Sequence, residues 1–417
     1  MSESVRVYIL ATKRFTPVFS FLLNDSSVKT VGAAEADVAI IVNEDPVHIA
    51  IKATEAPDKP MLFLVDGIVE WRNLFTRPDR ASEKLYMSLF HPVLSHKVAC
   101  IGPSQARLLE HWGNLGKCEV TGSPRLDPLF AVRERVRERR EDRKNDLEKG
   151  AMMRVLVITA KRPGFNDEQM AAVERGLSDV KAWAEQWNAD SNRPGPAVSL
   201  EWRVTRGLDE KLGVNTSASE FSGAELAEVL ERVDAVVTTP STAMLEAMFL
   251  EKPVALLDYT NSPHYVPAAW EITSPQHVDP VMRMLLNPHP HRMLYQDYIL
   301  HDAWRCDEPA APRVIKLIRE MVRIGRECRE KGLPLRFPNR MVEGPDPTWP
   351  SRVYDPKAIF PNHPILWDMD LQAMRAELGN FRLAWRTMER EHQSGWYKLG
   401  QKLMPIRRVF SRLLGHR

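Results

Sequence analysis

The sequence predicts an α/β protein with two doubly wound, Rossmann-like lobes, followed by a proline-rich strap and C-terminal helices. Short aliphatic runs alternate with plausible helices twice along the chain, as expected of buried parallel strands and their crossover helices. A densely charged segment separates the two series, and 417 residues with 44% hydrophobic content are enough for two cores. We therefore expect two lobes and an appendage.

The first lobe is expected over residues 1–130. Its predicted strands are short aliphatic or β-branched runs bounded by turn formers or polar residues: Val5–Ala11, Val28–Val31, Val38–Val42, Met61–Val65, Val98–Ile101 and Cys118–Thr121. After the fifth run, Gly102 and Pro103 lead into a predicted helix over 105–113, which Ser104 is expected to cap. This order of strand, turn and helix is typical of a doubly wound sheet.

Residues 131–150 are expected to form a solvated helix between the lobes, because both signs of charge are dense there and no wide apolar stripe is present. A second series of elements predicts the second lobe over 151–330. Its expected strands are Arg154–Ile158, Val198–Val204, Ala235–Val237 and Pro253–Leu257, and its expected helices include Ala224–Glu231 and Ser241–Leu250. The second lobe thus repeats the architecture of the first.

Beyond the second lobe, prolines crowd residues 331–365, which predicts an extended strap or linker. Residues 366–417 carry two helical patterns. Apolar residues spaced three and four apart from Leu371 to Met388 form a short heptad seam, which we expect to pack within the chain. The segment from Trp396 onward is basic and amphipathic without any acid, so it fits either a helix on an anionic membrane or a helix docked on the body.

Composition excludes several classes of protein. The formal net charge is only +2, which argues against a nucleic-acid binder. The four cysteines form no CxxC pair, so neither a zinc ribbon nor a disulfide scaffold is expected. No signal peptide or membrane span is evident. We expect a cytoplasmic protein whose basic tail is the candidate for contact with the inner membrane face.

The most informative stretch runs from Val233 to Leu257. A buried strand is expected to end before Ser241 or Thr242, either of which suits the cap of the next helix, and Glu246 lies about one turn into that helix. Free backbone N–H groups at such a helix start suit a diphosphate, and Glu246 can accept hydrogen bonds from ribose hydroxyls. An ordinary capped helix in an α/β sheet explains the same pattern.

Two segments resemble a known group of enzymes. Asp234–Leu257 is similar to the donor-binding segment of glycosyltransferases with the GT-B fold and of their relatives, the polyol-phosphate transferases and UDP-GlcNAc 2-epimerases. Val120–Asp127 resembles the Gly-x-Pro-Arg-x-Asp segment that closes the first lobe in those families. By architecture the resemblance covers residues 1–330, and it implies two GT-B lobes with a nucleotide site in the second.

The resemblance also implies which residues bind the donor. They lie in the loops and helix starts that face the space between the lobes: Gly122, Pro124, Arg125, Lys161, Arg162, Arg206, Pro240, Ser241, Thr242 and Glu246. Lys161 or Arg162 would neutralise charge on the leaving phosphate. For Arg125 a structural ion pair at the domain junction is the alternative, and for Lys161 and Arg162 a solvated loop pair.

The candidates for the general base are Asp66, Glu70 and His91. Asp66 sits in an Asp-Gly turn directly after a predicted strand, where open α/β sheets place their chemistry, and Glu70 follows soon after. A base there would deprotonate an acceptor hydroxyl held against the donor. The alternatives are a turn aspartate, an exposed glutamate and a packing histidine. No metal site is expected, because the HxH at His289 and His291 stands among prolines without further ligands.

These features together predict a glycosyltransferase that moves a sugar from a nucleotide-diphosphate donor to a glycan or lipid-linked acceptor, in envelope or capsular polysaccharide synthesis. We expect it to need no metal and no cofactor. Because Pro240-Ser241-Thr242 replaces the Gly-Gly turn common in such transferases, a CDP-polyol phosphotransferase is the first alternative. A catalytically inactive scaffold of the same fold is the second.

Overall fold

The computed structural model describes residues 4–10, 18–42, 52, 55–69, 90, 93–214, 216, 225–262 and 264–344. All of them belong to the first of two compact units, Met1–Asp355; the second unit is Pro356–Arg417. The predictions for Glu70, His91, the greater part of the strap, the heptad helix and the basic tail lie outside the described residues.

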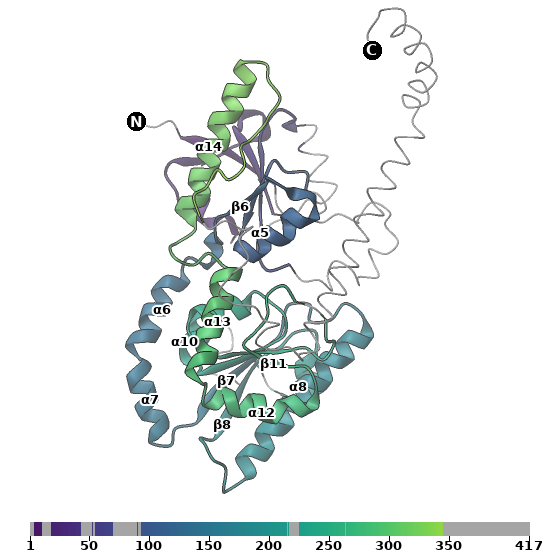
Figure 1. Ribbon diagram of the computed structural model, residues 1–417, viewed down its shortest axis with the longest axis vertical. Coiled ribbons are helices and arrows are strands. Elements are labelled where there is room, and N and C mark those ends of the chain that lie inside the picture. The colour runs from purple at the N-terminus through teal and green to yellow at the C-terminus, as the bar shows by residue number, and fades with distance from the viewer. Residues whose placement is uncertain are drawn as a thin grey trace, which may run out of the picture. The chain divides into compact units, whose positions relative to one another are not determined.

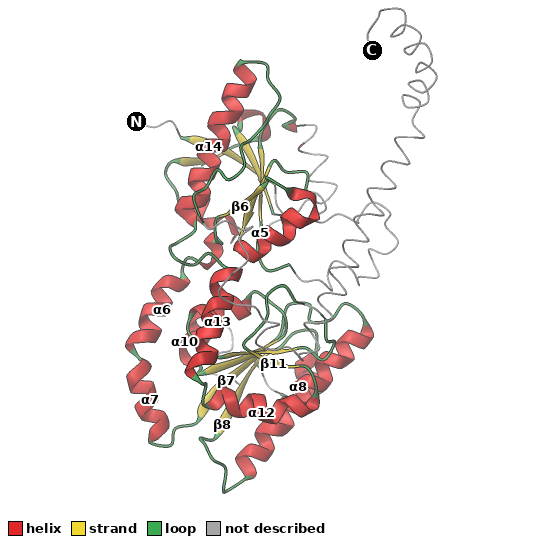
Figure 2. Cartoon of the chain, in the orientation of Figure 1, coloured by secondary structure: helices red, strands yellow, loops and turns green. Residues whose placement is uncertain are grey.

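The first lobe is built on a six-stranded parallel sheet in the order β2-β1-β3-β4-β5-β6 (Figures 1 and 2). Its strands are β1 (Val5–Leu10), β2 (Val28–Thr30), β3 (Val38–Ile41), β4 (Met61–Leu64), β5 (Lys97–Cys100) and β6 (Cys118–Val120). Strands β3, β4 and β5 are buried along their whole length, which is why β3, β4 and the part of β5 after Lys97 are unbroken apolar runs in the sequence. All six predicted strands are confirmed.

The second lobe has a five-stranded parallel sheet in the order β11-β10-β9-β7-β8. Its strands are β7 (Met153–Ile158), β8 (Val198–Arg203), β9 (Ala235–Thr238), β10 (Val254–Leu257) and β11 (Trp270–Ile272). From β7 the chain moves one way to β8, and then returns past β7 to add β9 and β10 on the other side. Right-handed crossovers in opposite directions place their helices on opposite faces, so the sheet is doubly wound as predicted.

Helices cover both sheets. In the first lobe they are α1 (Ser20–Leu23), α5 (Pro103–Leu109), the π-helical turn η3 (Glu110–Asn114) and the 3₁₀ turns η2 (Ala33–Glu35) and η4 (Pro124–Leu126). The connection holds α6 (Leu129–Glu138) and α7 (Arg140–Glu148). The remaining helices are α8 (Asp167–Ala189), α9 (Leu208–Leu212), α10 (Leu226–Arg232), α11 (Ala243–Phe249), α12 (Pro275–Leu286), α13 (Pro290–Ala303) and α14 (Ala311–Glu330). No helix in these described ranges is long and apolar enough to cross a membrane.

Helix α14 corrects the expected division of the chain. The sequence prediction assigned residues 151–330 to the second lobe, but α14 packs in the core of the first (Figure 1). Its buried Val314, Leu317 and Met321 share a cluster with residues of β1, β3 and β4, such as Ile40. Its apolar residues recur every three to four positions, which fixes the face that it buries but not the sheet that receives this face.

The segment that leads into α14 crosses closely over the first lobe at two glycines. A Cβ atom on Gly102 would lie 2.3 Å from the backbone of Ala303, and one on Gly122 would lie 2.8 Å from the carbonyl oxygen of Arg305. Gly122 also has a φ of +83°, a conformation that glycine adopts without strain. The backbone N–H of Arg305 donates to the carbonyl of Ile101 at 2.9 Å. These glycines are therefore required by the return of the chain to the first lobe.

Two local predictions were wrong. Ser104 does not cap α5: Gly102 is the N-cap residue, Pro103 begins the helix, and no side chain bonds to its free N–H groups. Residues 131–150 do not form one solvated helix, because α6 and α7 are separate and α6 buries Leu129, Val132 and Val136. Arginines of both helices instead form ion pairs with Glu231, Asp234 and Glu251 of the second lobe, so the connection is fastened to that lobe.

A buried ion pair fixes the chain that follows α14. The ammonium of Lys97 lies 2.6 Å from the Glu119 carboxylate, with both side chains at most 1% exposed. Lys97 also donates to the Pro338 carbonyl, and Glu119 accepts from the backbone N–H groups of Met341 and Val342. The pair on β5 and β6 thus holds residues 338–342 against the first lobe.

We expect Glu119→Gln to lower the free energy of unfolding by about 3–5 kcal/mol, because it leaves the Lys97 charge buried without a counterion. Urea denaturation measures the loss. The double variant Lys97→Met/Glu119→Gln removes that charge and keeps an acceptor oxygen for one of the two N–H groups, so it should recover part of the stability. Equal denaturation midpoints for the single and double variants would contradict this account.

Candidate functional site

The strand order of the second lobe marks one place for a ligand. From β7 the chain adds β8 on one side and later returns to add β9 on the other side. The carboxyl ends of β7 and β9 therefore form the topological switch point of the sheet. Open parallel sheets bind their ligands in the crevice at this point. The loops that begin at Thr159 and Thr239 meet there, because the Thr239 hydroxyl accepts from the backbone N–H of Ala160 at 2.8 Å. Both loops had been predicted to face the donor.

Basic side chains gather in the loops after β7 and β8. The hydroxyls of Thr159 and Thr205 lie 3.1 Å apart and join these loops, and the guanidinium of Arg206 donates to the Lys161 carbonyl at 3.3 Å. Lys161 and Arg206 are exposed, and Arg162 lies over the Phe165 ring at 5.0 Å. Arg206 has a φ of +64°, an uncommon backbone conformation for a residue with a Cβ atom. The structure thus brings Lys161, Arg162 and Arg206 together at the switch point.

The start of α11 differs from the predicted cap. Thr242 occupies the N-cap position, but its hydroxyl does not bond to its own helix. The hydroxyl accepts instead from the backbone N–H of Ile68 in the first lobe, at 3.1 Å. The Ser241 hydroxyl lies 3.3 Å from that of Thr238. Thr242 is therefore a contact between the lobes.

Gly67 makes this contact close. A Cβ atom on Gly67 would lie 2.4 Å from the Thr242 hydroxyl oxygen, well inside van der Waals contact. The Gly67 carbonyl accepts from the Gln105 amide at 3.0 Å, which fixes the turn after β4. The Asp-Gly turn predicted at the end of this strand is thus pressed against the start of α11.

Arg125 joins the two lobes electrostatically. Its guanidinium lies 3.3 Å from the Asp66 carboxylate of the first lobe and 3.4 Å from the Glu246 carboxylate on α11 of the second. The Glu246 side chain is only 10% exposed, whereas those of Arg125 and Asp66 are 30% and 41% exposed. Arg125 forms the ion pair at the domain junction that was one of its two expected roles, and it brings Asp66, a predicted base, beside Glu246.

Burial raises the pKa of Glu246. The loss of solvation is the largest cause, and the nearby Asp66 charge acts in the same direction, while Arg125 and Arg203 oppose it. A carboxylate whose charge is disfavoured by its surroundings, at the edge of a sheet where ligands bind, is typical of a functional residue. Arg203, the last residue of β8, was missed by the sequence prediction although its position at a strand's carboxyl end was a usable signal.

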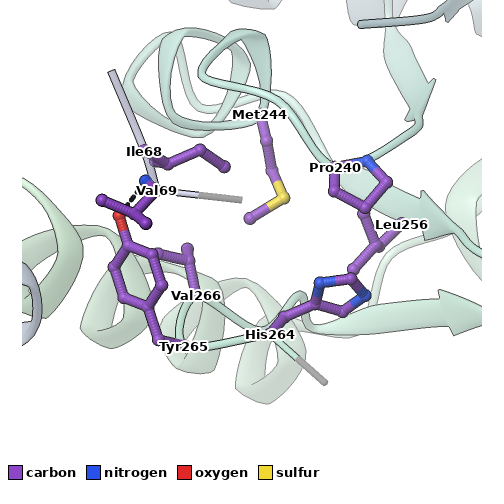
Figure 3. Close-up of a pocket in the computed structure, with 8 residues that line it drawn as sticks. All are labelled: Ile68, Val69, Pro240, Met244, Leu256, His264, Tyr265 and Val266. Carbon is purple, nitrogen blue, oxygen red and sulfur yellow. Dashed lines mark hydrogen bonds between the residues drawn. The ribbon is translucent and has the colours of Figure 1, made fainter. Parts of the chain in front are cut away.

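An apolar pocket lies beside this cluster, and both lobes line it (Figure 3). Its walls come from the segment after β4, the start of α11, the end of β10 and the loop after β10: Ile68, Val69, Pro240, Met244, Leu256, His264, Tyr265 and Val266. The Tyr265 hydroxyl accepts from the Val69 N–H at 2.9 Å, and burial raises the pKa of this phenol, so it stays neutral. Tyr259, which also follows β10, donates to the Asp179 carboxylate at 2.7 Å.

One polar pair beside the pocket was not predicted. The Nε2 atom of His264 lies 2.9 Å from the Asp258 carboxylate, and these residues are only 6% and 2% exposed. The two lie six positions apart in an irregular loop that follows β10. No spacing rule for loops brings such residues together, so only the structure shows the pair.

The remaining predicted residues lie elsewhere or outside the described ranges. Gly122 lies against the segment that returns to α14, and Pro124 is buried at the start of η4. Glu70 and His91 are outside the described residues. His289 and His291 lie at the N-terminus of α13, where the His289 side chain accepts from the His291 N–H. Among described residues, no three metal-ligating side chains converge.

Comparisons with known proteins place the fold. No protein-family model matches the sequence, and a search of curated proteins finds no match. Solved structures do match, and those described here share 11–13% identity with this chain. The co-structure of S. aureus MnaA with UDP is 11% identical, with 80% of this chain and 100% of that chain covered and a TM-score of 0.50.

Two further structures give the same result. A putative UDP-N-acetylglucosamine 2-epimerase from Listeria monocytogenes is 12% identical, covers 81% of this chain and 100% of its own, and has a TM-score of 0.50. A variant of the wall teichoic acid polymerase TagF soaked with CDPG is 13% identical, covers 77% of this chain and 89% of its own, and has a TM-score of 0.50. The chain therefore has the two-lobed GT-B fold, as its strand orders and motifs predicted.

The contact at Gly67 predicts a specific coupling between lobes. Gly67→Ala should lower the free energy of unfolding by about 1–3 kcal/mol, because the new methyl group overlaps the Thr242 hydroxyl. Thr242→Ala removes the overlapping atom, so the double variant should be less destabilised than the sum of the two single variants. Chemical denaturation of the four proteins measures this. Strict additivity would show that the two residues do not touch.

The raised pKa of Glu246 predicts how stability depends on pH. The folded protein binds a proton at Glu246 more tightly than the unfolded chain, so this residue stabilises the fold at low pH and loses that contribution as pH rises through its folded pKa. Glu246→Gln mimics the neutral form and should raise the unfolding midpoint at pH 7 but not at pH 4. A lower midpoint for Glu246→Gln at pH 7 would mean that its ion pair with Arg125 is a net stabiliser.

Proposed function

We propose that the protein is a metal-independent glycosyltransferase that binds a nucleotide-diphosphate sugar in its second lobe and an acceptor hydroxyl in its first. The acceptor would be a glycan or a lipid-linked sugar of an envelope or capsular polysaccharide. Glu246 carries the proposal: a buried carboxylate at the start of α11, next to the switch point of the second sheet, and ion-paired to the first lobe through Arg125. The GT-B fold supports it, since the solved structures that share the fold include one with UDP.

Each part of this site has a chemical task in the proposed reaction. Glu246 would accept hydrogen bonds from the ribose hydroxyls, and Ser241 would donate to the diphosphate. Lys161, Arg162 and Arg206 would neutralise the charge that develops on the leaving diphosphate, in a place that is already positive before the reaction begins. Burial between the lobes would exclude water from the reacting groups and hold them in line.

Arg125 would change partners when the donor binds. In the structure its guanidinium is shared between Asp66 and Glu246 at 3.3 and 3.4 Å, distances that are long for paired charges. A diphosphate nearby would compete for the same guanidinium. Release of Asp66 from Arg125 would then free a carboxylate at the end of β4.

A thermal-shift screen against UDP, GDP, CDP, ADP and dTDP, each with and without EDTA, tests the proposal. We expect one nucleoside diphosphate to raise the unfolding midpoint by several degrees through ligand linkage, with no effect of EDTA. A preference for CDP would favour the polyol phosphotransferase. No shift with any nucleotide would favour the inactive scaffold, and a shift abolished by EDTA would refute metal independence.

Glu246→Ala connects that result to the site. We expect it to weaken binding of the stabilising nucleotide at least tenfold, measured by calorimetry, because the ribose hydroxyls lose their acceptor. Glu185→Ala, an exposed carboxylate on α8 with a 67% exposed side chain, is the matched control and should bind as the parent does. Unchanged affinity in Glu246→Ala would remove this residue from the donor site.

A further inference from the structure

We propose that His264 is the general base of the transfer reaction and that Asp258 positions it. This inference rests on the proposed function and adds a catalytic residue that neither the sequence motifs nor the shared fold assigns. Its basis is the pair of buried side chains in contact at 2.9 Å, of which His264 lines the apolar pocket.

The surroundings of Asp258 favour an ionised carboxylate that accepts a hydrogen bond from His264. One oxygen accepts from both the N–H and the hydroxyl of Thr260, at 3.0 and 2.5 Å. The other oxygen receives the Ser262 N–H at 3.3 Å and faces His264 Nε2. A carboxylate that accepts several hydrogen bonds is held in its charged form, so Nε2 of a neutral His264 carries the hydrogen. The other ring nitrogen, Nδ1, is then the basic atom.

Nδ1 faces the pocket. Figure 3 shows the His264 ring at the edge of the pocket with one ring nitrogen turned into the pocket. The other nitrogen, Nε2, is hydrogen-bonded to Asp258, which does not line the pocket, so the nitrogen that faces the pocket is Nδ1. The pocket wall around it is apolar, with Met244 and Val266 on the side of the second lobe. An unprotonated ring nitrogen in such a wall is the arrangement that a general base requires.

The pocket also lies where both substrates would meet. Pro240 and Met244 line it and flank Ser241 and Thr242 of the proposed donor site, while Ile68 and Val69 enter it from the first lobe. Asp66, the base expected from sequence, is paired with Arg125 in this structure, whereas Nδ1 of His264 points into the space between the lobes.

The proposed step balances as follows. Nδ1 takes the proton of the acceptor hydroxyl while the acceptor oxygen forms a bond to the anomeric carbon of the sugar. The bond from that carbon to the diphosphate oxygen breaks, and its electron pair leaves with the nucleoside diphosphate. The imidazolium that results is stabilised by the Asp258 carboxylate, and its proton passes to solvent when the products leave.

The first test measures turnover and binding separately. His264→Asn and Asp258→Asn are compared with His301→Asn, an exposed histidine on α13. The substrate is the nucleotide sugar whose nucleoside diphosphate gives the largest thermal shift, with water in place of the acceptor hydroxyl, and the readout is release of that nucleoside diphosphate. We expect His264→Asn to lower kcat at least 100-fold, with nucleotide affinity within twofold of the parent. His301→Asn should match the parent in both.

The second test needs no turnover. In protein labelled with ¹⁵N-histidine, the signal lost in His264→Asn, or in His264→Gln if the first variant does not fold, identifies His264 among the 12 histidines. We expect a proton on Nε2 and none on Nδ1, and a mixture of tautomers in Asp258→Asn, which a merely structural role for Asp258 would not produce.

The outcomes separate the two proposals. Absence of nucleotide binding by the parent protein refutes the proposed function. Nucleotide binding with parental turnover in His264→Asn overturns the role of His264 and leaves the proposed function intact. A proton on Nδ1 in the parent overturns it as well, whatever the turnover.

Discussion

The arrangement of the lobes depends on the return of the chain across the first lobe between α13 and α14. Backbone there lies against Gly102 and Gly122 at distances that leave no room for a Cβ atom. Helix α14 then supplies buried residues to the core of the first sheet. Because α14 follows the second lobe in the sequence, the first lobe is built from segments on both sides of the second. The two lobes are thus joined twice, by α6 and α7 in one direction and by the returning segment in the other.

That double connection sets the carboxyl edges of the two sheets against one another, and the candidate site follows from it. Loops after β4 and β6 of the first sheet and after β7, β9 and β10 of the second reach this region, because the parallel strands of each sheet place their carboxyl ends at one edge of that sheet. Contacts across the interface include hydrogen bonds from the Ile68 N–H to the Thr242 hydroxyl and from the Val69 N–H to the Tyr265 hydroxyl, and the ion pair of Arg125 with Glu246.

Electrostatics divides the site into two parts with different tasks. Around Glu246 and Arg125 the side chains are charged, and Glu246 is costly to keep ionised because it is buried. Around Met244 and Val266 the wall is apolar, and His264 brings the polar atom into it. A polar end suits the diphosphate and ribose of a donor, and a dry end with an oriented imidazole suits deprotonation of a hydroxyl.

By itself the sequence determined every described strand except β11 and the doubly wound class of both lobes, because buried parallel strands are largely apolar runs. It also brought Asp66, Arg125 and Glu246 forward as candidates. Tertiary structure decided the contacts that no local pattern records: the turn of the Thr242 hydroxyl away from its own helix, the packing of α14 on the first sheet, and the pairing of His264 with Asp258. Periodicity records which face of an element is buried, whereas the partner of that face depends on the path of the whole chain.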